Sequence, residues 1–299
     1  AMRDKLFEHR APRVRPGWDD KVLADWNGLM IAALSRAAVV FDQPEWLARA
    51  EQAFAFVRDV MQSPGGPSGD GRLWHAARAG SAKAPATASD YANMVWAALR
   101  LYQATGNSAY LDQARAWTAT LDRHYWDATA GGYFTSADDT ADVIARLKSA
   151  SDDAVPSANA IQLGNLIALA ALTGEAGFDR QARDLIAAFA GAVAAAPIGH
   201  CGLLAAALDL EQLAQIKVMG VEATKLDAVL RTLSVPGAIE FGSGIPDVQS
   251  SAFNDRVAET SRESGALVCS GQVCSAPIVE PDAFRKRLLE IRRSSQTSA

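Results

Sequence analysis

Carboxylate, amide, hydroxyl and aromatic side chains gather at the starts of three apolar segments of this chain. Hydroxyl groups of a sugar need polar partners of these kinds, and the apolar face of a sugar ring stacks on an indole or phenol ring. The pattern therefore predicts a site for a small, sugar-like ligand. The residues concerned are Asp25, Trp26, Asn27, Asp90, Tyr91, Asp153, Ser157 and Asn159.

Two long insertions precede the second and third of these segments and add further candidates. Residues 63–86 are rich in Gly, Pro and Ser but carry Trp74 and His75, and residues 127–155 carry Tyr133. Connections of this length inside a compact domain are more often functional than short ones. We expect Trp74 and Tyr133 to contact the ligand.

Acid–base chemistry at a sugar carbon needs two titratable groups on opposite sides of the ligand. The pairs available are Asp90 with Asp153 and Asp90 with His75. We therefore predict that Asp90, Asp153 and His75 are the catalytic residues. The sequence contains no phosphate loop, dinucleotide fingerprint or Gly-x-Ser-x-Gly elbow, and we expect no cofactor.

Each candidate also has a purely structural interpretation. Asp90 occupies the third position of a capping box that begins at Thr87, and Asp25 is placed as the N-cap of the first apolar helix. Trp74 and His75 could lie on the surface of the body, and Asp153 could belong to a polar helix lead-in. We expect Asp90 to face the cavity, because an internal repeat aligns it with Trp26, which is too large and apolar to cap a helix.

That repeat defines the elements that position the site. One pattern occurs three times, with offsets of 64 and then 68 residues. It consists of a residue at a turn, an aromatic residue four positions later and an alanine four positions after that. The spacing predicts three helical hairpins whose first helices are buried. It also predicts that Asn27, Tyr91 and Asn159 lie at one end of neighbouring helices and line one cavity. The repeated residues are Asp42, Trp46 and Ala50; Gly106, Tyr110 and Ala114; and Gly174, Phe178 and Ala182.

Periodicity and turn signals assign the remaining elements. Residues 1–20 form a basic, irregular lead-in, and the runs 131–135 and 143–147 could pair as a hairpin. The expected helices cover 24–41, 44–62, 87–105, 108–125, 156–172, 178–195 and 202–213. The expected order after residue 213 is a strand at 215–221, a helix at 224–234, strands at 238–242, 265–269 and 275–279, and a helix at 281–293. We thus expect two domains, a helical one at 1–213 and a small α/β one at 214–299.

Composition narrows the possible partners. The chain has 299 residues, of which 49% are hydrophobic, and a net charge of −5. An acidic balance argues against a nucleic-acid surface, and no apolar run is long enough to cross a membrane. Three cysteines are too few for a secreted disulfide scaffold, so we expect a cytoplasmic protein. Cys269 and Cys274 lack the spacing of a metal site, and we expect two buried thiols rather than a disulfide, and no metal.

Five segments resemble the C-terminal part of the thioredoxin-domain-containing, spermatogenesis-associated protein family. They are Asp-Asp-Lys-Val-Leu-Ala-Asp-Trp-Asn-Gly-Leu-Met-Ile at 19–31, Ser-Asp-Tyr-Ala at 89–92, Gly-Gly-Tyr-Phe-Thr at 131–135, Asp-Asp-Ala-Val-Pro-Ser-Ala-Asn at 152–159 and Val-Cys-Ser-Gly-Gln-Val-Cys-Ser-Ala-Pro at 268–277. The resemblance implies a mainly α fold, an incomplete (α/α) toroid similar to N-acylglucosamine 2-epimerases and six-hairpin glycosidases. It also implies a thioredoxin-like domain that precedes this part.

Two classes of function follow. One is an epimerase-like or glycosidase-like enzyme, an isomerase or hydrolase acting on sugars at the mouth of the toroid. The other is a binding or scaffolding module of a thioredoxin-domain protein that lacks catalysis. Because the expected helices are too few to close a ring, apolar flanks would remain exposed, and we also expect self-association.

Overall fold

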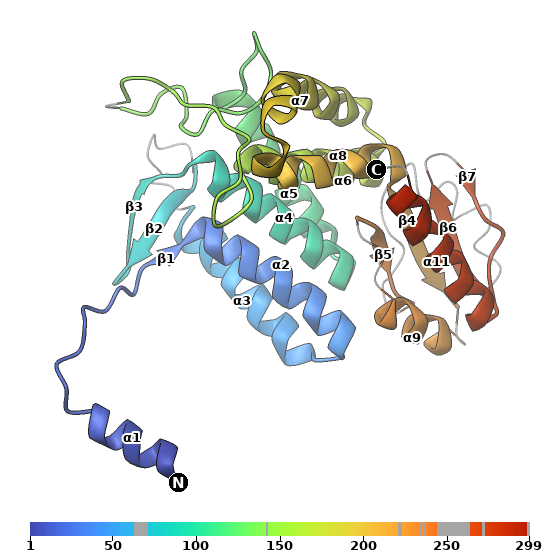
Figure 1. The fold of residues 1–299 in the computed structure, drawn as a ribbon, viewed down its shortest axis with the longest axis horizontal. Coiled ribbons are helices and arrows are strands. Elements are labelled where there is room, and N and C mark those ends of the chain that lie inside the picture. Colours follow the sequence, from blue (N-terminus) through green and yellow to red (C-terminus); the bar gives the residue numbers. More distant parts are fainter. Residues whose placement is uncertain are drawn as a thin grey trace.

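Three helical hairpins follow one another in the computed structural model of this chain (Figure 1). The structure describes residues 1–299 except 63–70, 142, 221–222, 234, 236, 244–263, 271–272 and 298–299. The hairpins consist of α2 (Ala24–Phe41) with α3 (Pro44–Val60), α4 (Ala88–Thr105) with α5 (Ser108–His124), and α6 (Ala158–Thr173) with α7 (Ala176–Ala195). A 3-10 turn, η1 (Pro197–His200), then leads into α8 (Cys201–Gln212).

The predicted repeat has a simple backbone cause. The first helix of each hairpin ends at a residue in the left-handed conformation: Asp42, Gly106 and Gly174, with φ of 54°, 71° and 73°. This conformation closes the last turn of a helix and redirects the chain. The alanines eight residues later are fully buried, because they face the helix that precedes the turn. They are Ala50, Ala114 and Ala182.

The first helices of the hairpins form the inner layer. α2 packs on α4, α4 on α6 and α6 on α8, while α3, α5 and α7 cover them from outside. The backbones of α2 and α4 lie close together at Gly28, where a Cβ atom would lie 2.6 Å from the backbone carbonyl carbon of Asn93. Only glycine permits the backbones of α2 and α4 to come so near.

A small antiparallel sheet, not predicted from the sequence, joins the starts of α2 and α4. It consists of β1 (Val22–Leu23), β2 (Trp74–Arg78) and β3 (Ser81–Pro85), and Leu23 pairs with Ala76. The segment around Trp74 and His75 is therefore a strand and not an irregular loop. Its pairing with β1 places His75 beside the beginning of α2.

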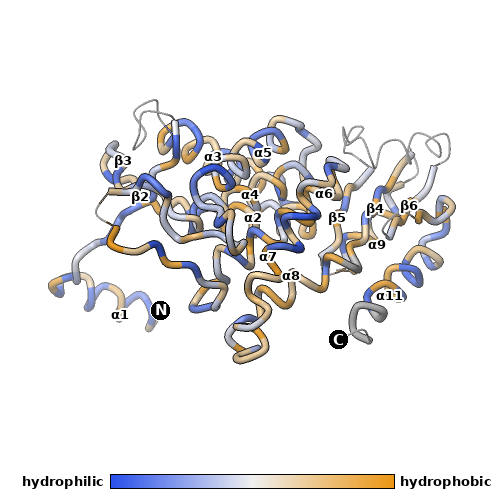
Figure 2. The backbone as a smooth tube through the Cα atoms, turned by 90° about the horizontal axis from the view of Figure 1, so that it is seen from above, coloured by the Kyte–Doolittle hydropathy of each residue, from blue (hydrophilic) through white to orange (hydrophobic). Residues whose placement is uncertain are grey.

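Several local predictions were wrong. The runs 131–135 and 143–147 do not form a hairpin; only the amide of Thr135 donates to the carbonyl of Leu147 (2.7 Å), and Tyr133 bridges to Trp126. Residues Met2–Arg10 form a helix, α1, whose residues are all exposed and which stands apart from the body in both views (Figures 1 and 2). The N-cap of α2 is Leu23, and Asp25 lies inside the first turn.

The C-terminal part contains a four-stranded sheet in the order β5-β4-β6-β7. β4 (Ala214–Met219) and β5 (Ile239–Phe241) are parallel and connected through α9 (Thr224–Thr232), which matches the predicted βαβ pattern. β6 (Gly265–Ser270) and β7 (Val273–Cys274) complete the sheet, and α11 (Pro281–Thr297) follows. Of the strand expected at 275–279, only an isolated bridge from Ile278 to Ala266 is present.

Each face of this sheet has a different partner. Side chains alternate between the two faces of a strand. Ala266 and Val268 of β6 join a cluster with α9 and α11, whereas Leu267 and Cys269 join the core of the helical body together with Ile239 and Phe241 of β5. The sheet is thus sandwiched between its own helices and the helical body.

The prediction for the two cysteines of the sheet was also wrong. Cys269 and Cys274 are directly paired across β6 and β7, with their Cα atoms 3.9 Å apart, and they form a disulfide. Antiparallel pairing brings the two side chains to the same face of the sheet, which a spacing of five residues did not indicate. The remaining cysteine, Cys201, is exposed and has a free thiol.

Candidate functional site

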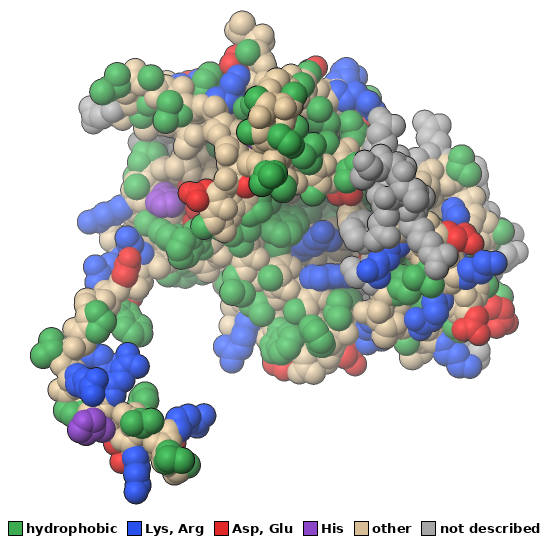
Figure 3. Space-filling view, viewed as in Figure 1, with side chains coloured by type: hydrophobic (Ala, Val, Ile, Leu, Met, Phe, Trp, Pro, Cys, Tyr) green, Lys and Arg blue, Asp and Glu red, His purple; other side chains and the backbone are tan. Residues whose placement is uncertain are grey.

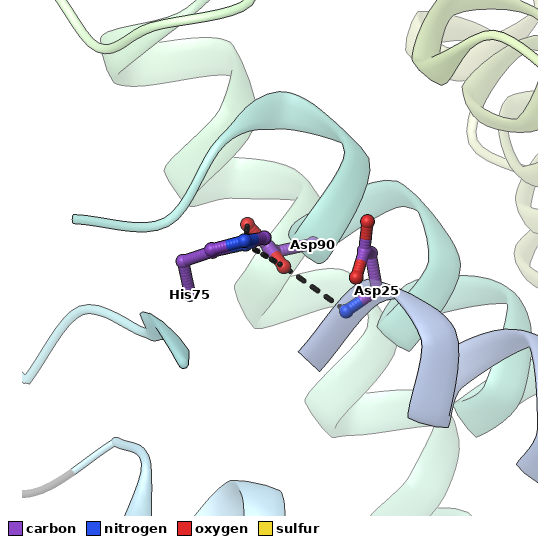
Figure 4. Close-up of side chains that lie close together, drawn as sticks. All are labelled: Asp25, His75 and Asp90. Atoms are coloured by element: carbon purple, nitrogen blue, oxygen red, sulfur yellow. Dashed lines mark hydrogen bonds and ion pairs between the residues drawn. The ribbon is translucent and has the colours of Figure 1, made fainter. Parts of the chain in front are cut away.

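Asp90 is the centre of a polar cluster where α2 and α4 begin (Figure 4). Its carboxylate is fully buried and accepts hydrogen bonds from the backbone amides of Thr87 (2.7 Å) and Asp25 (3.0 Å). The first bond is the one expected of a capping box, and the second ties α2 to α4. Asp90 therefore has the structural role considered from the sequence, and in addition it contacts a titratable side chain.

That side chain is His75, which β2 places against Asp90 (Figure 4). Its Nδ1 lies 3.0 Å from each carboxylate oxygen of Asp90. This hydrogen bond raises the pKa of His75 above its ordinary value, burial opposes the rise, and the charges of Asp90 and Asp25 add to it. The His75 side chain remains 32% exposed, and its Nε2 makes no hydrogen bond to a described residue. A ligand can therefore reach the imidazole but not Asp90.

Asp25 is the third member of the cluster. It is partly buried, and its Oδ1 accepts a hydrogen bond from the amide of Trp26 (2.7 Å). Burial is the main cause that raises the pKa of the Asp25 carboxyl, and the charge of Asp90 raises it further. One nitrogen of His75 and one oxygen of each aspartate lie within 4.8 Å of one another. The cluster thus combines two accessible titratable groups with one buried carboxylate.

The same three side chains are a conceivable ligand set for a metal ion. However, the carboxylate of Asp90 already accepts hydrogen bonds from two backbone N–H groups and from Nδ1 of His75. A cation bound to this carboxylate would have to displace these donors. The geometry therefore favours a hydrogen-bonded relay over a metal centre. A second set, formed by His124, Asp138 and Asp139, lies at the surface, where His124 pairs with Asp138 and Arg72 pairs with Asp139.

The aromatic residues predicted to contact the ligand differ in accessibility. Trp26 is 62% exposed and directly follows Asp25, and Trp74 is partly buried next to His75. Tyr91 and Tyr133 are each about 1% exposed. The hydroxyl of Tyr91 accepts from the amide of Leu73 (2.9 Å), and that of Tyr133 donates to Asp122 (2.7 Å). Of these four aromatic residues, the two tryptophans therefore keep exposed ring surface, and the two tyrosines do not.

The three residues aligned by the repeat contact different backbone segments. Asn27 donates to the carbonyl of Leu23 (2.8 Å), and Asn159 is buried and exchanges hydrogen bonds with the backbone of Tyr133. Tyr91 lines a cavity of about 150 Å³ that is lined by neither Asn27 nor Asn159. The repeat located the helix starts, but hydrogen bonds to local backbone orient each side chain.

The residues before α6 do not join the cluster. Asp153 is exposed, and its described contact is a backbone bond from its amide to the carbonyl of Val155 (3.1 Å). Ser157 is the N-cap of α6 and accepts from the amide of Ala160 (3.2 Å). Asp152, which directly precedes Asp153, accepts hydrogen bonds from the amides of Ser157 and Gly202. The structure therefore brings His75, and not Asp153, to Asp90.

A group of charged residues inside the molecule was missed from the sequence. It consists of Arg36, Arg100, Asp209 and Glu240, which line cavities between the helical body and the C-terminal sheet. The sequence does carry a signal for this group, because Arg36 and Arg100 are isolated charges within otherwise apolar helical runs. Their partners come from distant parts of the chain, which periodicity does not connect.

No protein-family model matches the chain. Human spermatogenesis-associated protein 20 is 29% identical over 306 residues, covering 95% of this chain and 38% of its own length. The mouse protein of that name is 28% identical over the same extent. The chain is thus homologous to the C-terminal 38% of these relatives and spans less than two thirds of their length.

An α-mannanase of glycoside hydrolase family 76 from Bacteroides thetaiotaomicron shares the fold, with a TM-score of 0.51 and 12% identity, over 97% of this chain and 73% of that one. Cellobiose 2-epimerase from Bacillus thermoamylovorans has a TM-score of 0.46 and 14% identity, over 56% of this chain and 44% of that one. The chain is accordingly a mainly α protein, an incomplete (α/α) toroid of helical hairpins with a small α/β part. Among the described residues, no helix is long and apolar enough to span a membrane.

Proposed function

We propose that this chain binds a carbohydrate where α2 and α4 begin and moves a proton on it with His75. The observation that carries the proposal is the contact of His75 with the buried Asp90 beside Asp25. Asp90 holds Nδ1 of the imidazole, so that Nε2 is the atom available to exchange a proton with a ligand. Asp90 acts here as a positioning residue, and Asp25 is the second group that can touch the ligand.

The arrangement of the carboxylates favours isomerase chemistry over hydrolysis. Glycoside hydrolysis by two carboxyl groups needs both to reach the scissile bond, about 5–9.5 Å apart. Asp90 has no exposed surface, so it cannot touch a glycosidic bond. His75 and Asp25 flank Asp90 (Figure 4) and are the accessible titratable groups of the cluster, which suits removal of a proton from the carbon next to a sugar carbonyl. Nε2 would take this proton and deliver it to the neighbouring carbon, while the proton of the hydroxyl on the first carbon passes to the former carbonyl oxygen, a transfer that the Asp25 carboxyl can mediate.

The two tryptophans support a carbohydrate as the ligand. Trp26 follows Asp25 and is 62% exposed, and Trp74 precedes His75. An exposed indole next to a titratable cluster provides the apolar face on which a sugar ring can stack. The (α/α) toroid fold of the chain is compatible with this proposal but does not by itself assign a ligand.

The alternative is a binding module of a longer thioredoxin-domain protein that does no chemistry. It is favoured by the hydrogen bonds of Tyr91, Tyr133 and Asn159, which are made within the protein. Fewer polar groups then remain for a ligand than the sequence predicted. Binding without proton exchange is the behaviour that would identify this case.

Solvent exchange tests the proposal without knowledge of the product. The chain is incubated in D2O with D-glucose, D-mannose, D-fructose or N-acetylglucosamine, and deuterium incorporation at the carbon next to the carbonyl is followed by NMR. We expect incorporation that is abolished by His75→Asn and kept by His124→Asn, whose imidazole lies in the surface pair with Asp138. A thermal-shift response without exchange would support the binding module. The absence of both deuterium exchange and a thermal-shift response would reject a carbohydrate function.

A further inference from the structure

The guanidinium of Arg100 is partly buried and has no counterion in contact among the described residues. It lies near the end of α4 and donates to the amide oxygen of Gln103 (3.3 Å). Within the described part of the chain no carboxylate forms an ion pair with it. Burial, followed by the charge of Arg36, lowers the pKa of Arg100, and Glu240 and Asp209 oppose this from beyond ion-pair distance. The site around Arg100 therefore favours an additional negative charge.

Three cavities meet at this side chain. One of about 240 Å³ lies between α2, α4, α9 and the end of β5, and one of about 330 Å³ lies between α4, α6 and α8. A third of about 420 Å³ is lined by α2, α4 and the residues Val235, Gly237, Ala238 and Glu240. Figure 3 shows Lys and Arg side chains in the hollow between the helical body and the C-terminal part. Arg100 is thus reachable from several directions.

The other charges of the first cavity have partners. Arg36 forms an ion pair with Glu240, and Arg231 pairs with Asp42 (3.4 Å). Asp227 accepts hydrogen bonds from both the amide and the hydroxyl of Ser243. Among the described residues that line this cavity, Arg100 is the charged group that remains unpaired. A buried charge without an opposite charge is costly, and a guanidinium pairs with carboxylate or phosphate through two parallel hydrogen bonds.

We propose that Arg100 is the anchor of a second ligand site, which binds the oxyanion of a small metabolite, a carboxylate or a phosphate ester. The body of the ligand lies along Trp96, which is partly buried and lines two of the three cavities. The site is distinct from the cluster of Asp25, His75 and Asp90. Asp90 and Arg100 lie about ten residues apart on α4, or ~15 Å along a helix axis. The proposal therefore does not depend on the proposed isomerase chemistry.

Isothermal titration calorimetry with three probes tests this site: inorganic phosphate, glucose 6-phosphate and gluconate, at constant ionic strength in chloride buffer. We expect at least one probe to bind, and Arg100→Met to weaken that binding at least tenfold. Arg115→Met is the matched control, because Arg115 is exposed on α5 and paired with Glu175, and it should bind like the parent. Binding of gluconate would identify a carboxylate ligand, and binding of the phosphates alone would identify a phosphate ester.

The substitution Glu240→Gln gives a second test, in which the affinity for the probe should rise rather than fall. Neutralising Glu240 frees the charge of Arg36 beside Arg100, so the probe should bind several-fold more tightly. This variant keeps the proposal testable should Arg100→Met fail to fold. The absence of binding by all three probes, binding that survives Arg100→Met, or binding lost in His75→Asn would overturn the proposal. The last result would assign the anion to the other site.

Discussion

At the scale of single residues, the contact between His75 and Asp90 decides when the imidazole is charged. The hydrogen bond to Asp90 is the largest cause of the raised pKa of His75, ahead of the opposing effect of burial. A raised pKa means that the folded state binds the proton more tightly than the unfolded state, whose histidine titrates near ~6.5. The stability that this contact contributes is therefore complete below about pH 6.5 and is lost as the pH rises through the folded-state pKa.

An NMR titration of the imidazole resonances tests this directly. We expect the midpoint of His75 to lie above ~6.5, the ordinary value, and to fall in Asp90→Asn, because the carboxamide no longer favours the charged imidazole. Between pH 6.5 and the folded-state midpoint, the unfolding temperature of the parent should also decrease. This decrease should be larger than that of the His75→Asn variant over the same interval. An unchanged midpoint in Asp90→Asn would show that the hydrogen bond does not control the titration.

Asp90 illustrates what the sequence could reveal about a single residue. The capping box identified its backbone contact to Thr87, and this contact is present. The bond between His75 and Asp90, fifteen positions apart, depends on the pairing of β2 with β1 and β3. Local patterns carry no information about such a register. The sequence predicts Asp153 as the titratable partner of Asp90, whereas the structure places it in an exposed loop.

At the scale of elements, the packing of α2 on α4 depends on Gly28. A Cβ atom there would lie 2.6 Å and 2.7 Å from the backbone C and O atoms of Asn93. Alanine is favoured over glycine inside a helix by about 1 kcal/mol, but overpacking costs about 1–3 kcal/mol. Because the clash is with backbone, both helices must separate, and the overpacking cost exceeds the gain in helix propensity.

We therefore expect Gly28→Ala to lower the free energy of unfolding by up to about 2 kcal/mol, which is the overpacking cost less the gain in helix propensity. Gly164→Ala on α6 is the matched control, because a Cβ atom at Gly164 meets nothing within 4 Å. That substitution should raise stability by about 0.5–1 kcal/mol through helix propensity alone. Urea unfolding followed by circular dichroism measures both. Equal effects of the two substitutions would show that the contact with Asn93 is not close in solution.

The helices could be predicted well because their signals are local. Left-handed residues at Asp42, Gly106 and Gly174 and apolar periodicity define the hairpins within the sequence itself. The sheet of β1, β2 and β3 was missed because β1 has two residues and β3 is mostly exposed, so neither shows alternation. The disulfide was missed for a related reason: it depends on the pairing of β6 with β7.

At the scale of the whole molecule, the arc of inner helices has two apolar ends. On α2, Trp26, Met30 and Phe41 are 62%, 59% and 64% exposed, and Ala33 and Ala37 lie between them on the same helical face. At the other end, α8 is apolar over residues 201–208 (Figure 2), and Leu204 and Leu208 are 39% and 40% exposed. An inner helix of a toroid normally has neighbours on both sides, and here α2 and α8 each lack one among the described residues.

Contiguous apolar surface of this kind favours association, because burying it removes roughly 25 cal/mol per Å² of unfavourable hydration. We therefore expect the isolated chain to self-associate through the exposed face of α2, and Met30→Glu to reduce the association by placing a charge in its centre. Ile144→Glu is the control, since Ile144 is fully exposed but lies in the connection between α5 and α6 and not on α2. Size-exclusion chromatography with light scattering measures the mass over a range of concentrations. A parent chain that stays monomeric at every concentration, or an Ile144→Glu variant that dissociates as readily as Met30→Glu, would show that the face of α2 does not drive association.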